Sequence, residues 1–275
     1  MLHSKLSFRW IVFVTLLLLG LDSPASIASS SNRTMQGRSL TSEIIANASK
    51  PKAPAKKARS KPRYIPGGRG TPTRTAAGTV RGNMCRGDQP PVALIPQIKN
   101  AANEISKVEV GTTVSDRPSF AFYVPPVSQR PTGATQPIRF TLYGPDQKIH
   151  WSTQLPGNVS GVVSVNLPKT ADPMEVDRVY NWVVRVDCNP NDQTERIEVE
   201  GWTMRIAPTV ELRKQLAQTA PEEVPALYAS FGIWHESISS LMELRRQKPN
   251  ARELVEDWKA LMDSANLKIP VAEGR

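Results

Sequence analysis

The strongest constraint on the fold is the strict alternation of residues 180 to 188. Every second residue of this segment is apolar: Tyr180, Trp182, Val184, Val186 and Cys188. Side chains of a β-strand point alternately to its two faces, so these five share one face of a single long strand. A strand with one apolar face must be covered by another layer, and the segment therefore predicts packed β-structure.

The same period of two recurs in short segments from about residue 90 to residue 207. Residues 92–96 are a predicted first strand, and three further inward faces are Phe120, Phe122 and Val124; Ile138, Phe140 and Leu142; and Val163, Val165 and Leu167. Turn signals at residues 144–147 and 189–192 predict hairpins, with residues 148–155 pairing back on the preceding strand. Seven short strands predict an antiparallel immunoglobulin-like β-sandwich over residues 89–207.

Three positions of this region carry more specific predictions. Tyr180 resembles a tyrosine corner, with Met174 as its packing partner. The last strand changes parity between Val199 and Trp202, which predicts a β-bulge near Gly201. Tyr123 is expected on the outer face of its strand, either as an aromatic recognition platform or as part of an ordinary sandwich strand.

After Pro208 the period changes from two to about 3.6, which indicates helices over residues 208–267. Residues 219–222 read as a capping box, Gly232 ends the following helix, and residues 233–247 and 250–261 form two more. Their predicted inward faces are Trp234, Ile238, Leu241 and Leu244, then Leu254, Trp258 and Leu261. The spacing from Tyr228 through Gly232 to Pro249 resembles one tetratricopeptide repeat, with Ser237 as its small residue. One repeat forms no groove, so we expect a helical hairpin packed on the sandwich, and an overall α+β fold that ends in a tail at residues 268–275.

The N-terminus is typical of a secretory signal peptide over residues 1–28. Lys5 and Arg9 precede an apolar run that Asp22 and Pro24 end, and small residues predict cleavage between Ala28 and Ser29. The alternative, an uncleaved anchor, needs about 20 apolar residues, and this run is shorter. We therefore expect export to the periplasm, the medium or a thylakoid lumen, without a transmembrane span after cleavage.

Export gives a meaning to the two cysteines of the chain, Cys85 and Cys188. An oxidising compartment favours a disulfide between them, and two free buried thiols are the alternative. A loop of this length would contribute about 4–5 kcal/mol in the chain-entropy model.

The net charge of +10 comes from one segment. Residues 50–86 contain eleven Lys or Arg and no Asp or Glu. Residues 29–88 are poor in large apolar side chains and are predicted to be a disordered tail. Its possible surface-binding residues are Lys50, Lys52, Lys56, Lys57, Arg59, Lys61 and Arg63. They would hold an anionic envelope surface or polymer, or else belong to a soluble tether that merely spaces the domain; nucleic acid is not an expected partner.

Several motifs together resemble one family. They occupy residues 81–85, 94–96, 113–125, 186–190, 199–202 and 232–237. Over about residues 68–265 the chain is similar to the exported cyanobacterial family of domain of unknown function 928. The resemblance implies an exported protein of this two-part architecture and implies no activity or site residue.

No catalytic, cofactor-binding or metal-ligating residue is predicted. His150 and His235 stand alone in the sequence and are expected at the surface. Glu198 and Glu200 alternate on one strand face and read as solvated residues rather than as a glycosidase pair. The sequence therefore favours a non-catalytic envelope-associated binding or scaffold protein, with another envelope protein as a candidate partner. The alternatives are a hydrolase of envelope polymers and a subunit of an exported assembly.

Overall fold

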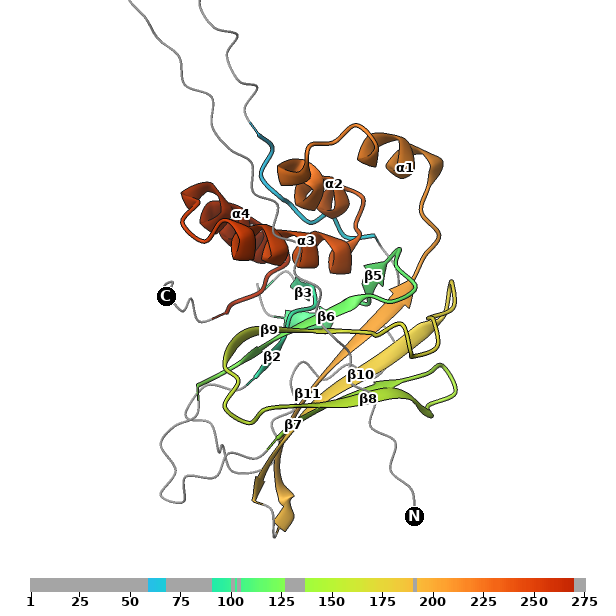
Figure 1. Cartoon of the computed structure of the whole chain (residues 1–275), viewed down its shortest axis with the longest axis vertical. Coiled ribbons are helices and arrows are strands. Elements are labelled where there is room, and N and C mark those ends of the chain that lie inside the picture. The colour runs from blue at the N-terminus through green and yellow to red at the C-terminus, as the bar shows by residue number, and fades with distance from the viewer. Residues whose placement is uncertain are drawn as a thin grey trace, which may run out of the picture. The chain divides into compact units, whose positions relative to one another are not determined.

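The computed structural model describes residues 59–67, 91–99, 102, 105–126, 137–189 and 192–269, with the backbone alone at 105–107, 188–189 and 192–195. The chain divides into two units, residues 1–55 and 56–275, and every described residue lies in the second. These residues form a mixed α+β fold in which strands come first and helices follow (Figure 1). The predicted fold class is confirmed at this level.

The strands form two main sheets and a small hairpin. The larger sheet has the order β5-β11-β10-β7-β8, with β5 Gly111–Thr113, β7 Ile138–Tyr143, β8 Ile149–Leu155, β10 Val179–Asn189 and β11 Asp192–Arg205. The second has the order β2-β6-β9, with β2 Val92–Ala93, β6 Ser119–Val124 and β9 Gly161–Asn166. The hairpin pairs β3 Gln97–Lys99 with β4 Ile105–Val108. Neighbours are antiparallel except β5, which runs parallel to β11.

Aromatic side chains join the two main sheets. The Phe120 ring on β6 lies 5.2 Å from the Phe140 ring on β7 and 6.0 Å from the Trp182 ring on β10, measured between centroids. Phe122 lies 6.4 Å from both Phe140 and Trp182. All four are fully buried, as are Ile138 and Leu142. The predicted inward faces of these strands are confirmed, because successive side chains of a pleated strand point to opposite faces.

The β-bulge predicted near Gly201 is wrong. The register of β10 and β11 runs without interruption from Val179↔Met204 to Asp187↔Arg196, with Trp182 opposite Gly201. Ile197, Val199, Gly201 and Thr203 all face inward and are buried. The apparent change of parity arises because Gly201 leaves room for the Trp182 indole, and Trp202 lies on the other face.

The remaining strand predictions concern the hairpin of β7 and β8, the contacts of Tyr180 and the first strands of the chain. The hairpin of β7 and β8 is confirmed, with Gly144 N–H donating to Lys148 O at 2.8 Å. The Tyr180 hydroxyl accepts a hydrogen bond from Glu175 N at 2.9 Å, and Met174 is buried. The predicted strand at residues 92–96 is only β2. The strands β3, β4 and β5 were not predicted, because they are short and not apolar enough to show a pattern.

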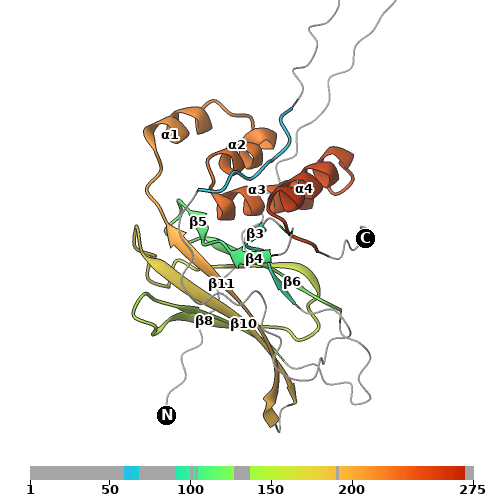
Figure 2. The ribbon, with the colours of Figure 1, turned by 180° about the vertical axis from the view of Figure 1, so that it is seen from behind.

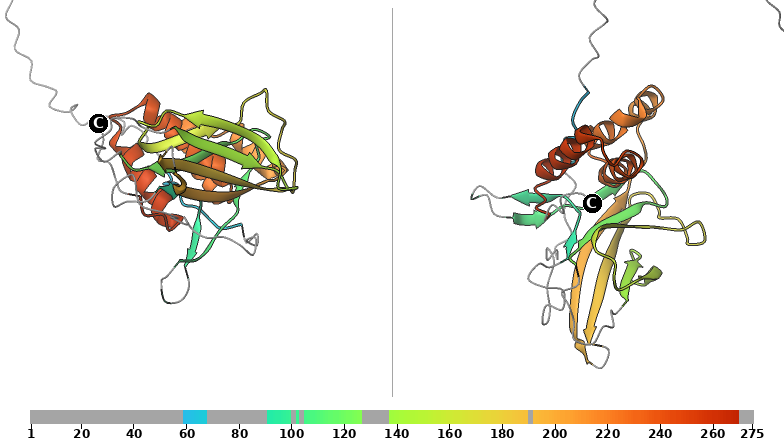
Figure 3. Two further views of the ribbon diagram at one scale, coloured as in Figure 1. Left: turned by 90° about the horizontal axis from the view of Figure 1, so that it is seen from below. Right: turned by 60° about the vertical axis from the view of Figure 1, so that its left-hand side comes forward.

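The helices follow the sequence closely. They are α1 Val210–Leu216, α2 Val224–Ser230 after a 3₁₀ turn at Pro221–Glu223, α3 Trp234–Gln247 and α4 Arg252–Ser264. Figure 3 shows these helices gathered on one side of the sheets. The predicted inward residues of α3 and α4 are buried. The capping box is wrong, because the Thr219 hydroxyl donates to Gln215 O of the preceding helix and the residue before the 3₁₀ turn makes no side-chain cap.

Gly201→Ala is expected to destabilise the protein by about 1–3 kcal/mol. The added Cβ would lie 2.8 Å from Nε1 of Trp182, inside the core. Gly67→Ala is the control, since a Cβ there meets no atom within 4 Å. Urea unfolding of both variants measures the difference. Equal free energies of unfolding would contradict the assignment of Gly201 to the Trp182 contact.

Candidate functional site

The described part of the basic tail is not disordered. Residues 59–67, hereafter the strap, are extended and pass between α2 and α4 (blue in Figures 1 and 2). Pro62 and Tyr64 are buried, while Lys61, Arg63 and Ile65 are exposed. This corrects the prediction of disorder for residues 59–67, and the rest of the predicted tail at residues 29–88 lies outside the described residues. The basic composition of this segment predicts disorder, but the side chains of Pro62 and Tyr64 pack against the folded part of the chain.

Ion pairs fix the first half of the strap. The Arg59 guanidinium pairs with Asp257 of α4, whose side chain is 4% exposed. Lys61 Nζ lies 2.8 Å from Glu256 Oε2, with both side chains more than half exposed. Arg63 lies at the surface. Of the predicted surface-binding residues, Arg59 and Lys61 are therefore engaged within the chain.

The remaining predicted site residues lie outside the described part of the chain. These are Lys50, Lys52, Lys56 and Lys57 of the tail, Ala28 and Ser29 at the predicted cleavage site, and Cys85. Cys188 belongs to β10, and only its backbone is described. The disulfide and the cleavage site stay predictions.

Tyr64 fixes the second half of the strap. Its ring packs edge-on against Trp234 at 5.3 Å between centroids, and its hydroxyl donates to the buried Glu109 carboxylate. Tyr64 N donates to Ser264 Oγ at 2.9 Å, and Ile65 N donates to Ala229 O at 3.1 Å. Burial raises the pKa of Tyr64, and the neighbouring Glu109 carboxylate raises it further. Burial also raises the pKa of Glu109, and the hydrogen bond from Tyr64 acts in the opposite direction. Both groups are held in place by partners far away in the sequence.

His235 is buried, which corrects its predicted surface position. Its Nδ1 lies 2.9 Å from Ser119 O, and its Nε2 lies 2.9 Å from Thr203 Oγ1. A carbonyl only accepts, so Nδ1 carries the proton and Nε2 accepts from the Thr203 hydroxyl. That hydroxyl in turn accepts from Trp182 Nε1 at 3.2 Å. One directed chain of hydrogen bonds thus connects β10, β11, α3 and β6.

Glu236, the next residue of α3, holds the segment between β5 and β6. Its Oε1 accepts from Thr113 Oγ1 at 2.5 Å, from Val114 N at 3.2 Å and from Ser115 N at 3.0 Å. Burial raises the pKa of Glu236, and these hydrogen bonds act in the opposite direction. Thr112 Oγ1 also donates to Gly232 O. The residues around Thr113 and those around His235 therefore meet at one junction between the sheets and the helices.

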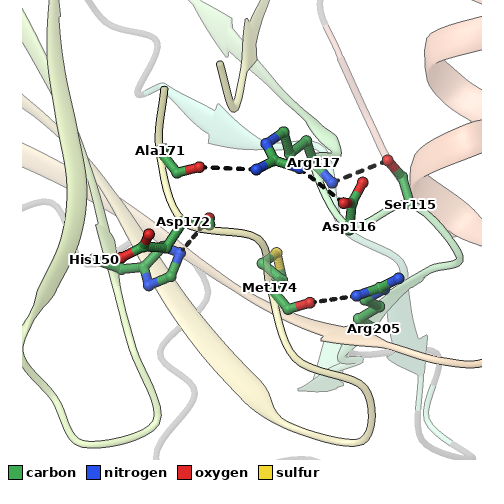
Figure 4. Close-up of polar contacts among 8 residues, drawn as sticks. All are labelled: Ser115, Asp116, Arg117, His150, Ala171, Asp172, Met174 and Arg205. Carbon is green, nitrogen blue, oxygen red and sulfur yellow. Dashed lines mark hydrogen bonds and ion pairs between the residues drawn. The ribbon is translucent and has the colours of Figure 1, made fainter. Parts of the chain in front are cut away.

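A second polar cluster lies beside this junction (Figure 4). Arg117 donates to Asp116 Oδ2 at 2.8 Å and to Ala171 O at 3.1 Å, and Arg205 donates to Met174 O at 2.7 Å. His150 Nε2 lies 2.9 Å from Asp172 O, and its ring packs edge-on against Tyr180 at 5.2 Å. These contacts fix the loop between β9 and β10 on its neighbours.

The described groups pair with one another rather than converge on an empty centre. Within the described ranges no group of three His, Cys, Asp or Glu is arranged to hold a metal ion. Glu198 lies within 2.7 Å of Arg185 and 3.1 Å of Arg196, which shows it as part of an ion-pair group on the strand. Tyr123 is 5% exposed, so the possible aromatic platform on its face is wrong. None of the helices that the structure describes is long and apolar enough to cross a membrane.

His235→Asn is expected to make the stability of the protein less sensitive to acid. Burial lowers the pKa of the folded-state imidazole from 6.5 to about 4. Between these pH values the unfolded chain binds a proton that the folded chain does not, so stability falls as pH falls, by up to about 3 kcal/mol. The raised pKa values of Glu109 and Glu236 act in the opposite direction and are present in both proteins. Urea unfolding from neutral pH to about pH 4.5 measures the difference, and parallel profiles would disprove the assignment.

Asp257→Asn is expected to lower the free energy of unfolding by about 2–3 kcal/mol, because the partly buried Arg59 charge loses its buried partner. Glu256→Gln removes the acid of an exposed pair and should leave stability nearly unchanged. Chemical denaturation of both variants at neutral pH compares them. An equal effect of the two substitutions would show that the strap is not held by Asp257.

The comparisons with known proteins place the chain in a family. No curated protein matches the chain, and no solved structure does. A family model described as Domain of Unknown Function (DUF928) matches residues 76–274, which leaves the strap outside and includes both halves of the junction. Because the match covers well over half of the sequence, the chain belongs to the DUF928 family.

Proposed function

We propose that this is an exported, envelope-associated binding or scaffold protein without catalysis, held at an anionic surface by its basic tail. The observation that carries the proposal is the attachment of the strap to the helices through Arg59 and Tyr64. Because the strap is fixed, the basic residues that precede it start from a defined place on the folded part. When a tail that is attached in this way binds a surface, the folded part is held at that surface as well.

The charges of the chain support this arrangement. Arg59 forms an ion pair with Asp257, and Lys61 forms one with Glu256. Four further basic residues precede the strap in the sequence, namely Lys50, Lys52, Lys56 and Lys57. Each basic residue near an anionic membrane contributes about 1 kcal/mol, which salt screens. The tail therefore favours lipid head groups or acidic polymers, and the folded part would present an interface to another envelope protein.

Export and the cysteine pair belong to the same proposal. A signal peptide at residues 1–28 would deliver the chain to the periplasm, the medium or a lumen of a cyanobacterium. In that compartment Cys85 and Cys188 would be oxidised.

Two finer features of the fold are also proposed. The strand orders β2-β6-β9 and β11-β10-β7-β8, in which the chain crosses between the sheets after β6, after β8 and after β9, are typical of an immunoglobulin-like sandwich. The pair of α2 and α3 supports a likeness to one tetratricopeptide repeat. There Ser237 is fully buried and donates to Pro225 O at 2.8 Å, and Gly232 takes a φ of 69°.

Replacing Lys50, Lys52, Lys56 and Lys57 by Glu in the mature protein should abolish binding to vesicles that contain anionic lipid. The reason is that these lysines supply the electrostatic attraction to anionic lipid. Added salt screens this attraction and should release the wild-type protein from the vesicles. Sedimentation with anionic and with neutral vesicles measures the bound fraction. The matched control replaces Lys148, Lys169, Lys214 and Lys259 of the folded part by Glu, for the same change of charge. Equal binding of both variants would contradict the proposal.

Mass spectrometry of the native protein without reductant should show a chain that begins at Ser29 and is lighter by two hydrogen atoms. This mass corresponds to one Cys85–Cys188 disulfide, and reduction should restore both hydrogens. A chain with its leader still attached and two thiols that react with an alkylating reagent would contradict both export and pairing.

A further inference from the structure

The helices bind the strap in the way that a protein binds an extended peptide. Tyr64 and Ile65 donate their backbone N–H groups to Ser264 on α4 and to Ala229 on α2. Main-chain hydrogen bonds of this kind provide affinity, and alternate side-chain pockets provide specificity. The strap shows this alternation, since Pro62 and Tyr64 are buried and the residues between and beside them are exposed.

The residues that hold the strap, hereafter the groove, are Glu109, Ala229, Gly232, Trp234, Asp257 and Ser264. Two positions of this groove are selective for a side chain of the strap. Asp257 is a buried carboxylate that takes the Arg59 guanidinium. Trp234 and Glu109 form the second position, where one contributes an aromatic face and the other a hydrogen-bond acceptor for the Tyr64 hydroxyl. Gly232 completes the groove, because a Cβ there would lie 2.8 Å from Ile65 O. Such positions recognise a segment in which Arg precedes Tyr by five residues.

The groove and its occupant belong to different parts of the chain. The groove residues lie within the family match, whereas the strap precedes it. Residues 68–90 connect the strap to β2, and 23 residues can span up to about 80 Å. A connection of this length allows the strap to reach its own groove or that of another molecule.

We infer that this groove is an exchangeable recognition site, and that its second occupant is the strap of another copy of this chain. Every contact of the strap is the same in either arrangement. Attachment within one chain gives the strap a high effective concentration, so dilute protein is monomeric. Exchange then requires either a high protein concentration or a groove that rejects its own strap. The inference does not depend on the proposed function.

A charge exchange between two full-length variants tests the inference. Arg59→Glu places a carboxylate opposite Asp257, and Asp257→Arg places a guanidinium opposite Arg59, so each variant repels its own strap. When the two are mixed, each strap finds an opposite charge in the other molecule. Light scattering should show monomers for each variant alone and a dimer for the equimolar mixture. The double variant with both substitutions in one chain should be monomeric.

The mixture gives a decisive result even where a variant does not fold alone. Recovery of a cooperative thermal transition and of a dimer only after mixing would support exchange. A mixture that scatters as the sum of its two components, with no such recovery, would overturn it.

A labelled peptide of residues 59–67 gives a second test, on the Arg59→Glu full-length protein, whose own strap no longer competes well. Saturable binding by fluorescence anisotropy is expected. A Tyr64→Ala peptide should bind about tenfold more weakly or worse, and a Lys61→Ala peptide should bind within about threefold of the original. Equal affinity of all three peptides would overturn the groove. Peptide binding without a mixed dimer would overturn the second copy as its occupant.

Discussion

The hydrogen-bond chain through His235 is the interaction on which the rest of the structure depends. It begins at the Trp182 indole in the core, passes through the Thr203 hydroxyl and the imidazole, and ends on the Ser119 carbonyl. Each member belongs to a different element, so the two sheets and α3 are fixed by one set of directional contacts. A buried polar chain of this kind is stable only when every group has a partner. The close approach requires Gly111 and Gly201, where a Cβ would meet His235 or Trp182.

Glu236 extends the same junction to the segment that follows β5. Because it follows His235 on α3, one helical turn supplies an imidazole to the core and a carboxylate to the segment between β5 and β6. The segment from Thr113 to Ser119 and the segment from Gly232 to Ser237 are distinctive in the sequence. Their meeting explains them as structural partners, and a role in chemistry is not needed to account for these residue types.

The strap shows how a basic segment becomes part of a fold. A buried carboxylate such as Asp257 is costly without a partner, and Arg59 provides one. Tyr64 then adds apolar burial and a hydrogen bond that the Lys-rich residues before it cannot offer. Of the basic residues in this region, Arg59 and Lys61 pair with carboxylates of α4.

The sequence by itself determined the elements whose pattern is local. The inward faces of β6, β7 and β10 and those of α3 and α4 follow from the geometry of strand and helix, whatever lies opposite. The tertiary structure alone decided the burial of His235, the unbroken register at Gly201 and the ordered strap. Each of these depends on a partner far along the chain, namely Thr203 and Ser119, the Trp182 indole, and Asp257 with Trp234. A single histidine, a glycine or a basic run has no local signal for such a partner, because its environment exists only after the chain has folded.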